Sequence, residues 1–212
     1  MTDKQKSILL SVIGIVITMA FLFPIYWMIT TAIRQPGETF MNPTFFPRSF
    51  SLEAFKIEAH NGVGLFTYMK NSVIIAFSAT VLGIVLSVPA SYGLARFKTR
   101  FVAILLFIFL VAQMLPSSLI LTPLFMTFKK LGILNNYLSA ILSDATLTIP
   151  FSVIVLRTYF KDIPKELDEA ATIDGCNAWQ TFLKVMLPIC KPGVATAVAM
   201  SLFMAWGDMV FS

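Results

Sequence analysis

Four long stretches without a charged residue constrain the fold of this chain more than any other feature. They cover residues 7–33, 71–95, 101–128 and 131–156, and only Asp144 interrupts the last of them. A helix needs about 20 mainly apolar residues to cross the hydrocarbon layer of a membrane. Four such stretches in succession predict an all-α, polytopic membrane protein.

The composition agrees with a membrane location. Charged residues make up 13% of the chain and hydrophobic residues 57%, whereas soluble domains carry about 25% charged residues. Lys4 and Lys6 precede the first stretch, but that stretch is longer than the roughly 7–15 apolar residues of a cleaved signal peptide. We therefore expect it to remain as a membrane anchor.

These patterns predict one transmembrane domain over residues 1–212, without linkers. We expect spans at about 7–33, 71–95, 101–128, 135–157 and 192–212. An outer loop would cover residues 34–70, and a cytoplasmic loop residues 158–191. Prolines inside the spans are tolerated where neighbouring groups or water satisfy the freed carbonyls.

The basic residues indicate the orientation. With a cytoplasmic N-terminus, cytoplasmic segments hold 10 of the 16 Lys and Arg residues, including the dense RFKTR turn at 96–100. Cytoplasmic loops of membrane proteins carry such an excess, although Lys129 and Lys130 argue for the opposite orientation. The net charge of +5 thus follows the membrane edges and does not indicate binding to nucleic acid.

The predicted cytoplasmic loop contains the segment ELDEAATIDGCNAWQTFLKVMLPICKP at 166–192. We expect a short helix that starts near Pro164, because proline suits a first helical position, and that stops at Gly175. Asn177, with Gln180 three residues later, resembles a capping box. It predicts a second helix from 178 to about 186, ended by Leu187-Pro188.

Two interpretations of this helix–turn–helix remain open. It could be an amphipathic loop lying at the membrane surface. Alternatively, the second helix packs against the transmembrane helices while the first, with its small Ala170 and Ala171, is available to a partner. The apolar stripe that would pack consists of Trp179, Phe182, Leu183 and Met186.

Residues 169–188 resemble the EAA loop of the permease subunits of binding-protein-dependent ABC importers. That motif is Glu-Ala-Ala, three residues, Gly, nine residues, Ile, one residue and Leu-Pro. Val185 replaces the Ile. The positions that match in register are Glu169, Ala170, Ala171, Gly175, Leu187 and Pro188.

The resemblance extends over almost the whole chain. Segments such as YMKNSVIIAF, ASYGLARFK and QMLPSSLILTPLF are similar to the carbohydrate-uptake branch of the family, above all to the second permease of maltose-type transporters. WGDMVF at 206–211 departs from that branch's pattern at Gly207 and Met209. Such permeases usually have six spans, so the resemblance implies that about five are present and that the chain is truncated at its C-terminus.

The resemblance implies a membrane-spanning permease subunit of an ATP-driven sugar importer in the bacterial plasma (inner) membrane. Its partners would be a cytoplasmic ABC ATPase dimer, a second permease subunit in a heterodimer, an extracytoplasmic solute-binding protein and membrane lipid. The first loop helix would be the coupling helix that sits in a groove of the ATPase. The implied coupling residues are Glu169, Ala170, Ala171, Asp174, Gly175, Leu187 and Pro188.

Three residues are candidates for the substrate path. Asp144 is costly inside a span, at roughly 2.5–3.5 kcal/mol on insertion scales, so it either reaches water near the outer end of its span or lines the sugar path. Gln113 and Trp206 could hydrogen-bond or stack on a sugar, and each could equally have a packing role.

Other functions are less well supported by the sequence. A permease for glycerol phosphate, polyamines or phosphonates, and a membrane scaffold that transports nothing, both remain open. An intramembrane enzyme is disfavoured because HExxH, GxSxG and paired intramembrane acids are missing, and the chain has no P-loop for ATP. We expect no catalytic residue, no cofactor and no metal site, since His60 is the only histidine.

Overall fold

The computed structural model describes residues 3–35, 44–53, 55–56, 64–97 and 100–208. The chain forms two compact units, residues 1–68 and 69–212, and each is described by itself. Throughout the described residues the regular structure is helical, which confirms the predicted all-α class.

The first unit consists of helix α1 (Asp3–Ala32) and the segment that follows it. Tyr26 and Arg34 donate hydrogen bonds to the carbonyl oxygens of Phe45 and Thr44, and the Arg34 guanidinium lies 5.2 Å from the centre of the Trp27 ring. These contacts hold residues 44–51 against the end of α1. Large parts of the predicted outer loop, 36–43 and 57–63, lie outside the described residues.

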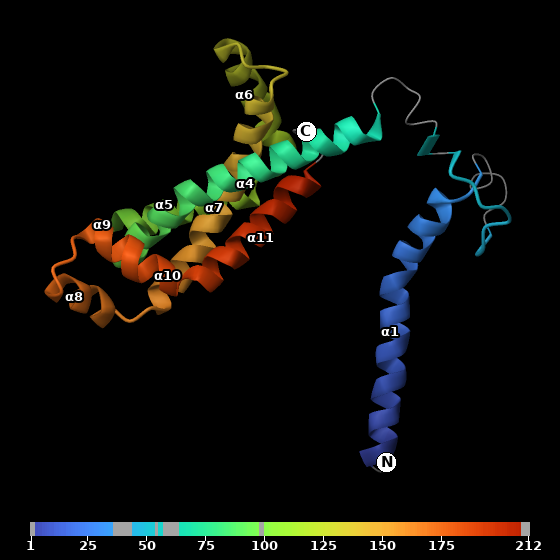
Figure 1. Ribbon diagram of the computed structural model, residues 1–212, viewed down its shortest axis with the longest axis horizontal. Helices are drawn as coiled ribbons and strands as arrows, with labels where there is room; N and C mark the ends of the chain where they lie inside the picture. Colours follow the sequence, from blue (N-terminus) through green and yellow to red (C-terminus); the bar gives the residue numbers. More distant parts are fainter. Residues whose placement is uncertain (1–2, 36–43, 54, 57–63, 98–99, 209–212) are drawn as a thin grey trace. The chain divides into compact units, whose positions relative to one another are not determined.

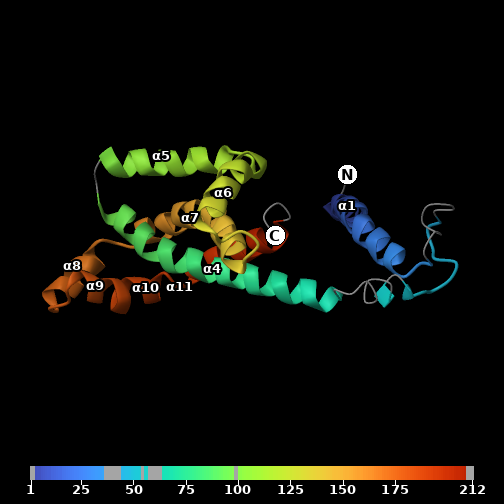
Figure 2. The same cartoon turned by 90° about the horizontal axis from the view of Figure 1, so that it is seen from above.

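The second unit is a helical bundle arranged around α7 (Figures 1 and 2). Helix α7 packs against α5 and α11, and its Ile149 carbonyl accepts a hydrogen bond from Ser87 of α4 at 3.3 Å. Residues 163–190, which contain the segment that resembles the EAA loop, lie between α7 and α11. The helices are α4 (Leu65–Arg96), α5 (Arg100–Met114), α6 (Ser117–Leu131), α7 (Tyr137–Asp162), α8 (Glu166–Ile173), α9 (Ala178–Thr181), the π-helix η1 (Phe182–Met186), α10 (Leu187–Ile189) and α11 (Lys191–Gly207).

Three helices, α1, α4 and α7, are long and apolar enough to cross a membrane, and the number rises to five if each of two bent pairs is one span. They correspond to the predicted spans at 7–33, 71–95 and 135–157. The predicted span at 192–212 corresponds to α11, although residues 209–212, the MVFS end, lie outside the described residues.

The predicted span at 101–128 is not one continuous helix. It consists of α5 and α6, which meet at an angle of 103°. Pro116 lies at the break in an extended conformation, with φ −60° and ψ 136°. Proline has no N–H for the helical ladder and disfavours a helical conformation in the residue before it. The bend between α5 and α6 in Figure 1 therefore follows from the proline at position 116.

Small residues allow α7 and α11 to approach closely. A Cβ atom at Gly193 would lie 2.5 Å from Cγ of Tyr159, and Ser152 and Ser201 share a buried hydrogen bond of 2.8 Å. Ala197 is fully buried in the same contact. Helices in membranes typically associate through such small side chains and interhelical hydrogen bonds.

Gly193→Val should therefore force α11 away from α7. Overpacking costs about 1–3 kcal/mol, and each kcal/mol lowers the melting temperature of a domain of this size by about 2–4 °C. Thermal unfolding of the detergent-solubilised protein measures this, with Ala195→Val on the exposed face of α11 as the control. Equal melting temperatures for the two variants would contradict the close contact.

Candidate functional site

Residues 163–190 form a helix–turn–helix at the end of the bundle where α4 finishes and α5 begins (Figure 2). The first helix, α8, starts at Glu166, two residues after Pro164. Its first turn carries Glu166, Asp168 and Glu169, and negative side chains are favourable at a helix N-terminus. The expected first helix is therefore present.

Gly175 ends the first helix because the turn requires a backbone conformation that glycine adopts easily. Its φ is +83°, a left-handed conformation that strains other residues. The Cys176 N–H donates to the Ala171 carbonyl at 2.9 Å, and the Gly175 N–H donates to the Thr172 carbonyl at 3.0 Å. These bonds form a Schellman motif. A Cβ at Gly175 would meet no described atom within 4 Å, so crowding is not the reason for glycine.

The second helix starts as the sequence predicts. The Gln180 N–H donates to Oδ1 of Asn177 at 2.9 Å, and the Asn177 N–H donates to Oε1 of Gln180 at 3.0 Å, which completes the capping box. Both bonds satisfy N–H groups that the first helical turn leaves free.

The predicted end of this helix at Leu187-Pro188 is wrong. The chain stays helical through Ile189 because the turn from Phe182 to Met186 widens into a π-helix, in which the Leu187 N–H donates to the Phe182 carbonyl. Pro188 has no N–H to offer the ladder. The wider turn lets the helix continue around it, as short π segments do elsewhere.

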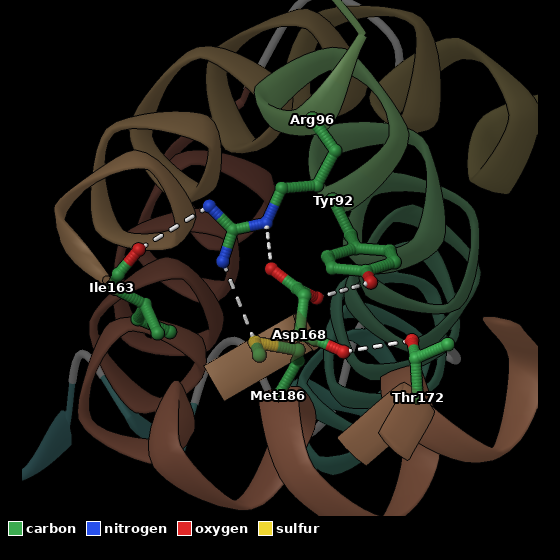
Figure 3. A network of polar contacts seen from close by, with 6 residues as sticks. All are labelled: Tyr92, Arg96, Ile163, Asp168, Thr172 and Met186. Carbon is green, nitrogen blue, oxygen red and sulfur yellow. Dashed lines mark hydrogen bonds and ion pairs between the residues drawn. The ribbon is translucent and has the colours of Figure 1, made fainter. Parts of the chain in front are cut away.

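Asp168 connects the loop to the transmembrane helices (Figure 3). Its Oδ2 lies 2.6 Å from Nε of Arg96, and its Oδ1 accepts a hydrogen bond of 2.8 Å from the Tyr92 hydroxyl. The Arg96 and Asp168 side chains are 15% and 21% exposed. Both carboxylate oxygens are thus used, and α8 is attached to the last turn of α4.

Two arginines join the ends of α4 and α7, each by a hydrogen bond to a backbone carbonyl near the end of the other helix. Nη1 of Arg96 donates to the carbonyl of Ile163, directly after α7, at 3.2 Å, and Nε of Arg157 on α7 donates to the carbonyl of Leu94 on α4 at 3.1 Å. Carbonyl groups in the last turn of a helix have no partner within the helix. Each helix therefore caps the other with a cation.

An aromatic cluster lies beneath the polar network. The Tyr92 ring is 5.5 Å from that of Phe160 and 5.2 Å from that of Phe182. Phe160 and Met186 are fully buried in the same core. The second loop helix is therefore packed into the bundle, as in the second of the two open interpretations, through two members of its predicted stripe. The other two, Trp179 and Leu183, are 61% and 42% exposed.

The expected coupling residues divide between two surfaces. Ala171 is 4% exposed and faces the bundle, whereas the neighbouring Ala170 is exposed, because consecutive helical residues point about 100° apart. The small alanine surface expected for a partner is thus reduced to Ala170. Ile173 is 85% exposed and was not expected. Of the remaining residues, Leu187 is half-buried and the exposed ones are Glu169, Asp174, Gly175 and Pro188.

The three substrate-path candidates do not share one cavity. Asp144 is 2% exposed, which argues against a side chain in open water, and it lines a cavity of about 250 Å³ with Ser117, Thr148 and Asp208. The expected absence of paired intramembrane acids is therefore wrong, because the fold brings Asp144 and Asp208 together across 64 residues, a separation that no local sequence pattern reveals. Gln113 donates to the Leu147 carbonyl at 2.8 Å, and Trp206 is 52% exposed. Neither Gln113 nor Trp206 lines that cavity.

Sequence reasoning did not find Tyr92 and Arg96 as partners of the loop. They precede Asp168 by 76 and 72 residues, and no local pattern pairs residues so far apart. Arg96 was counted only among the basic residues of a membrane edge. The available signal was the spacing of four between Tyr92 and Arg96, which places both on one face at the end of a span.

Comparison with known proteins identifies the family. A model described as "Binding-protein-dependent transport system inner membrane component" matches residues 79–212. The diacetylchitobiose uptake system permease protein DasC of Streptomyces coelicolor is 30% identical over 200 residues, which cover 94% of this chain and 72% of the relative. The sulfoquinovosyl glycerol transport system permease protein SmoH of Agrobacterium fabrum is 32% identical over 192 residues, with coverages of 90% and 67%.

More distant relatives and a solved structure agree. The trehalose/maltose transport system permease protein MalG of Thermococcus litoralis is 28% identical over 211 residues, covering 99% of this chain and 76% of the relative. A crystal structure of a bacterial ABC transporter involved in the import of the acidic polysaccharide alginate has the same fold, with a TM-score of 0.78 and 24% identity over 98% of this chain and 72% of that chain. The chain therefore belongs to the family of binding-protein-dependent transport system inner membrane components, the multi-pass permease subunits of ABC importers, which do not hydrolyse ATP themselves.

Proposed function

We propose that this permease imports a sugar or a short oligosaccharide and receives the energy of ATP hydrolysis through α8. The named substrates of DasC, SmoH and MalG are diacetylchitobiose, sulfoquinovosyl glycerol and trehalose or maltose. A cytoplasmic ATPase dimer, a second permease and an extracytoplasmic solute-binding protein complete the proposed assembly. The N-terminus and the α8 end of the bundle face the cytoplasm in this proposal.

One observation carries the coupling role: α8 is fastened on one face and free on the other. Asp168 and Ala171 face the bundle, while Glu169, Ala170 and Ile173 are exposed. A helix that transmits a push needs both properties. A solvated loop would need neither the ion pair nor the buried alanine.

The exposed face offers suitable contacts for a protein groove. Ile173 is a large apolar side chain that is 85% exposed, and Ala170 leaves room for close approach. The Glu169 carboxylate can accept a charge-assisted hydrogen bond, which is roughly twice as strong as a neutral one. Asp174 adds a second carboxylate where α8 ends.

The fastened face defines what would move. A force on α8 reaches α4 through the contacts of Asp168 with Arg96 and Tyr92. It reaches α7 through Phe182 and Met186, which pack in one core with Phe160. Leu187 packs against the same core, so we propose that Leu187 and Pro188 shape the second helix rather than bind the ATPase. The ends of α4 and α7 would then move as one body with α8, as in rigid-body transitions of packed elements.

Substitutions on the exposed face of α8 should release the ATPase. We expect Glu169→Lys and Ile173→Asp each to lower ATPase recovery at least several-fold when the full transporter is purified through the permease. Truncation of a hot-spot residue at an interface costs about 2 kcal/mol or more, and we expect Glu169 and Ile173 to be such residues. Asp162→Lys, an exposed acid at the end of α7, is the matched control for charge.

Two substitutions at Gly175 separate the effect of the backbone conformation on ATPase binding from the effect of side-chain size. Asn tolerates the left-handed conformation, so Gly175→Asn should keep the ATPase, whereas Gly175→Trp should lose it and still insert in the membrane. Full recovery of the ATPase with Glu169→Lys, Ile173→Asp and Gly175→Trp would contradict the coupling role and return the segment to a surface loop.

Loss of the Asp168 carboxylate should loosen α8. Asp168→Ala leaves the partly buried Arg96 without its anion and Tyr92 without its acceptor, and one hydrogen bond to a charged group contributes about 1.5–3 kcal/mol. Hydrogen exchange of the amides in 166–176 should accelerate roughly tenfold or more, since about 1.4 kcal/mol corresponds to a factor of ten. Glu166→Ala, an exposed acid in the same turn, is the control, and equal exchange in both variants would show that the network does not fix the helix.

Asp144 is the substrate-path residue that we retain, because its buried carboxylate faces a cavity between helices. The contacts of Gln113 support a packing role at the end of α5. Buried carboxylates need hydrogen-bond donors, and sugar hydroxyl groups supply them.

Asp144→Ala should reduce uptake of radiolabelled trehalose, maltose or diacetylchitobiose, whichever the intact transporter imports, while the complex still assembles with its ATPase. Loss of a charged hydrogen-bond partner is worth about 1.5–3 kcal/mol, or roughly 10-fold to 150-fold in affinity. Thr158→Ala on the same helix is the control. Unchanged uptake by the Asp144 variant would remove it from the path.

A further inference from the structure

Two adjoining cavities lie where α4, α5 and α7 meet. The basic pocket, of about 380 Å³, is lined by Arg96, Arg157, Lys161 and Lys165, together with apolar residues of α5. The apolar groove, of about 450 Å³, runs between α4 and α5. It is lined by Pro89, Ala90, Gly93, Leu94, Phe97, Phe101, Val102, Leu105 and Phe109. Phe97 and Val102 line both cavities, so the two lie next to each other.

The basic pocket keeps three positive charges without a carboxylate partner. Arg96 is neutralised by Asp168 at 2.6 Å, and this is the ion pair found among the described residues. Arg157 uses Nε for the Leu94 carbonyl, while Lys161 and Lys165 are exposed. Three cations gathered around one pocket repel each other, which an anionic ligand would relieve.

The apolar groove leads from the basic pocket toward the middle of the spans. From Phe97, directly after α4, back to Pro89, and from Phe101 to Phe109 on α5, each wall spans eight residue steps, or about 12 Å of helix. The cations lie only at the end where α4 and α7 finish. The combined site is therefore charged at the membrane edge and apolar within the membrane.

We propose that the basic pocket and the apolar groove together bind one anionic glycerophospholipid, with its phosphate among Arg157, Lys161 and Lys165 and an acyl chain between α4 and α5. Guanidinium and ammonium groups form strong hydrogen bonds to phosphate. Basic pockets between membrane helices suit anionic head groups. The assignment to the cytoplasmic leaflet rests on the proposed function, which places α8 in the cytoplasm.

The shape of the site favours a lipid over a free anion or a protein segment. Inorganic phosphate or a sugar phosphate would satisfy the cations but leave the apolar groove exposed. An apolar helix of another subunit would fill the groove but leave three cations without anions. A phospholipid satisfies both parts, and α4 and α7 are themselves long and apolar enough to cross a membrane.

The test uses the complete transporter, purified with its partner permease and ATPase, stripped of lipid in a neutral detergent and titrated with dioleoylphosphatidylglycerol. Native mass spectrometry counts the bound lipid. Dioleoylphosphatidylcholine has the same chains with a zwitterionic head group, and glycerol 3-phosphate has the charge without chains. We expect phosphatidylglycerol to bind several-fold more tightly than phosphatidylcholine, and glycerol 3-phosphate to displace it poorly.

The variants separate the two parts of the site. Combined Arg157→Gln, Lys161→Gln and Lys165→Gln should weaken phosphatidylglycerol binding roughly tenfold or more, since a basic residue at the membrane surface contributes about 1 kcal/mol. If the triple variant fails to assemble, the exposed single variants Lys161→Gln and Lys165→Gln replace it in the test. Each should weaken phosphatidylglycerol binding by a smaller factor. Ala90→Phe fills the apolar groove and should weaken binding of both lipids. Lys129→Gln, Lys130→Gln and Lys191→Gln together remove the same charge outside the site and should have no effect.

Several results would overturn the proposal. One is equal affinity for the two lipids, and another is full displacement of phosphatidylglycerol by glycerol 3-phosphate. A third is unchanged lipid binding in the pocket and groove variants, which is the result expected if another subunit covers the groove. ATPase recovery is scored in the same purifications. Recovery unaffected by the α8 variants would contradict the coupling role alone, because lipid binding is measured separately.

Discussion

The carboxylate of Asp168 is the point on which the arrangement of the loop depends. Its two oxygens are shared between Arg96 at 2.6 Å and Tyr92 at 2.8 Å, so one side chain of α8 is held by two side chains one turn apart on α4. Two contacts to one carboxylate fix its orientation as well as its position. The helix that carries it cannot rotate about its own axis without breaking one of them, and this keeps Glu169 and Ile173 on the free face.

The energy and the geometry of this junction come from different interactions. A largely buried ion pair costs desolvation that offsets much of its attraction. Aromatic pairs such as Tyr92 with Phe160 and Phe182 contribute about 0.5–1.5 kcal/mol each beyond the area they bury. The aromatic core therefore stabilises the junction, while the Arg96–Asp168 pair selects one register of α8 on that core. A helix that slid by a residue would keep apolar contacts but lose the pair.

The sequence predicts those features that a single local pattern encodes. Uncharged runs predict α1, α4 and α7, Gly175 predicts the end of α8, and Asn177 with Gln180 predicts the start of the next helix. The break at Pro116 and the π turn before Pro188 were missed, because a proline inside an apolar run can kink, end or leave a helix continuous according to its packing. The contacts of Asp168 with Tyr92 and Arg96 cross more than 70 residues, and only the tertiary structure brings them together.

Arg96 and Arg157 do more than place positive charge at a membrane edge. Both are half-buried, and each donates to a carbonyl at the end of the other's helix. Arg96 binds Asp168 and also lines the basic pocket, so one guanidinium forms a wall common to the coupling junction and to the proposed lipid site. An anion in that pocket would compete with Asp168 for Arg96 unless Arg157, Lys161 and Lys165 carried its charge. In the proposed lipid site these three side chains would hold the phosphate, and Arg96 would stay paired with Asp168 of α8.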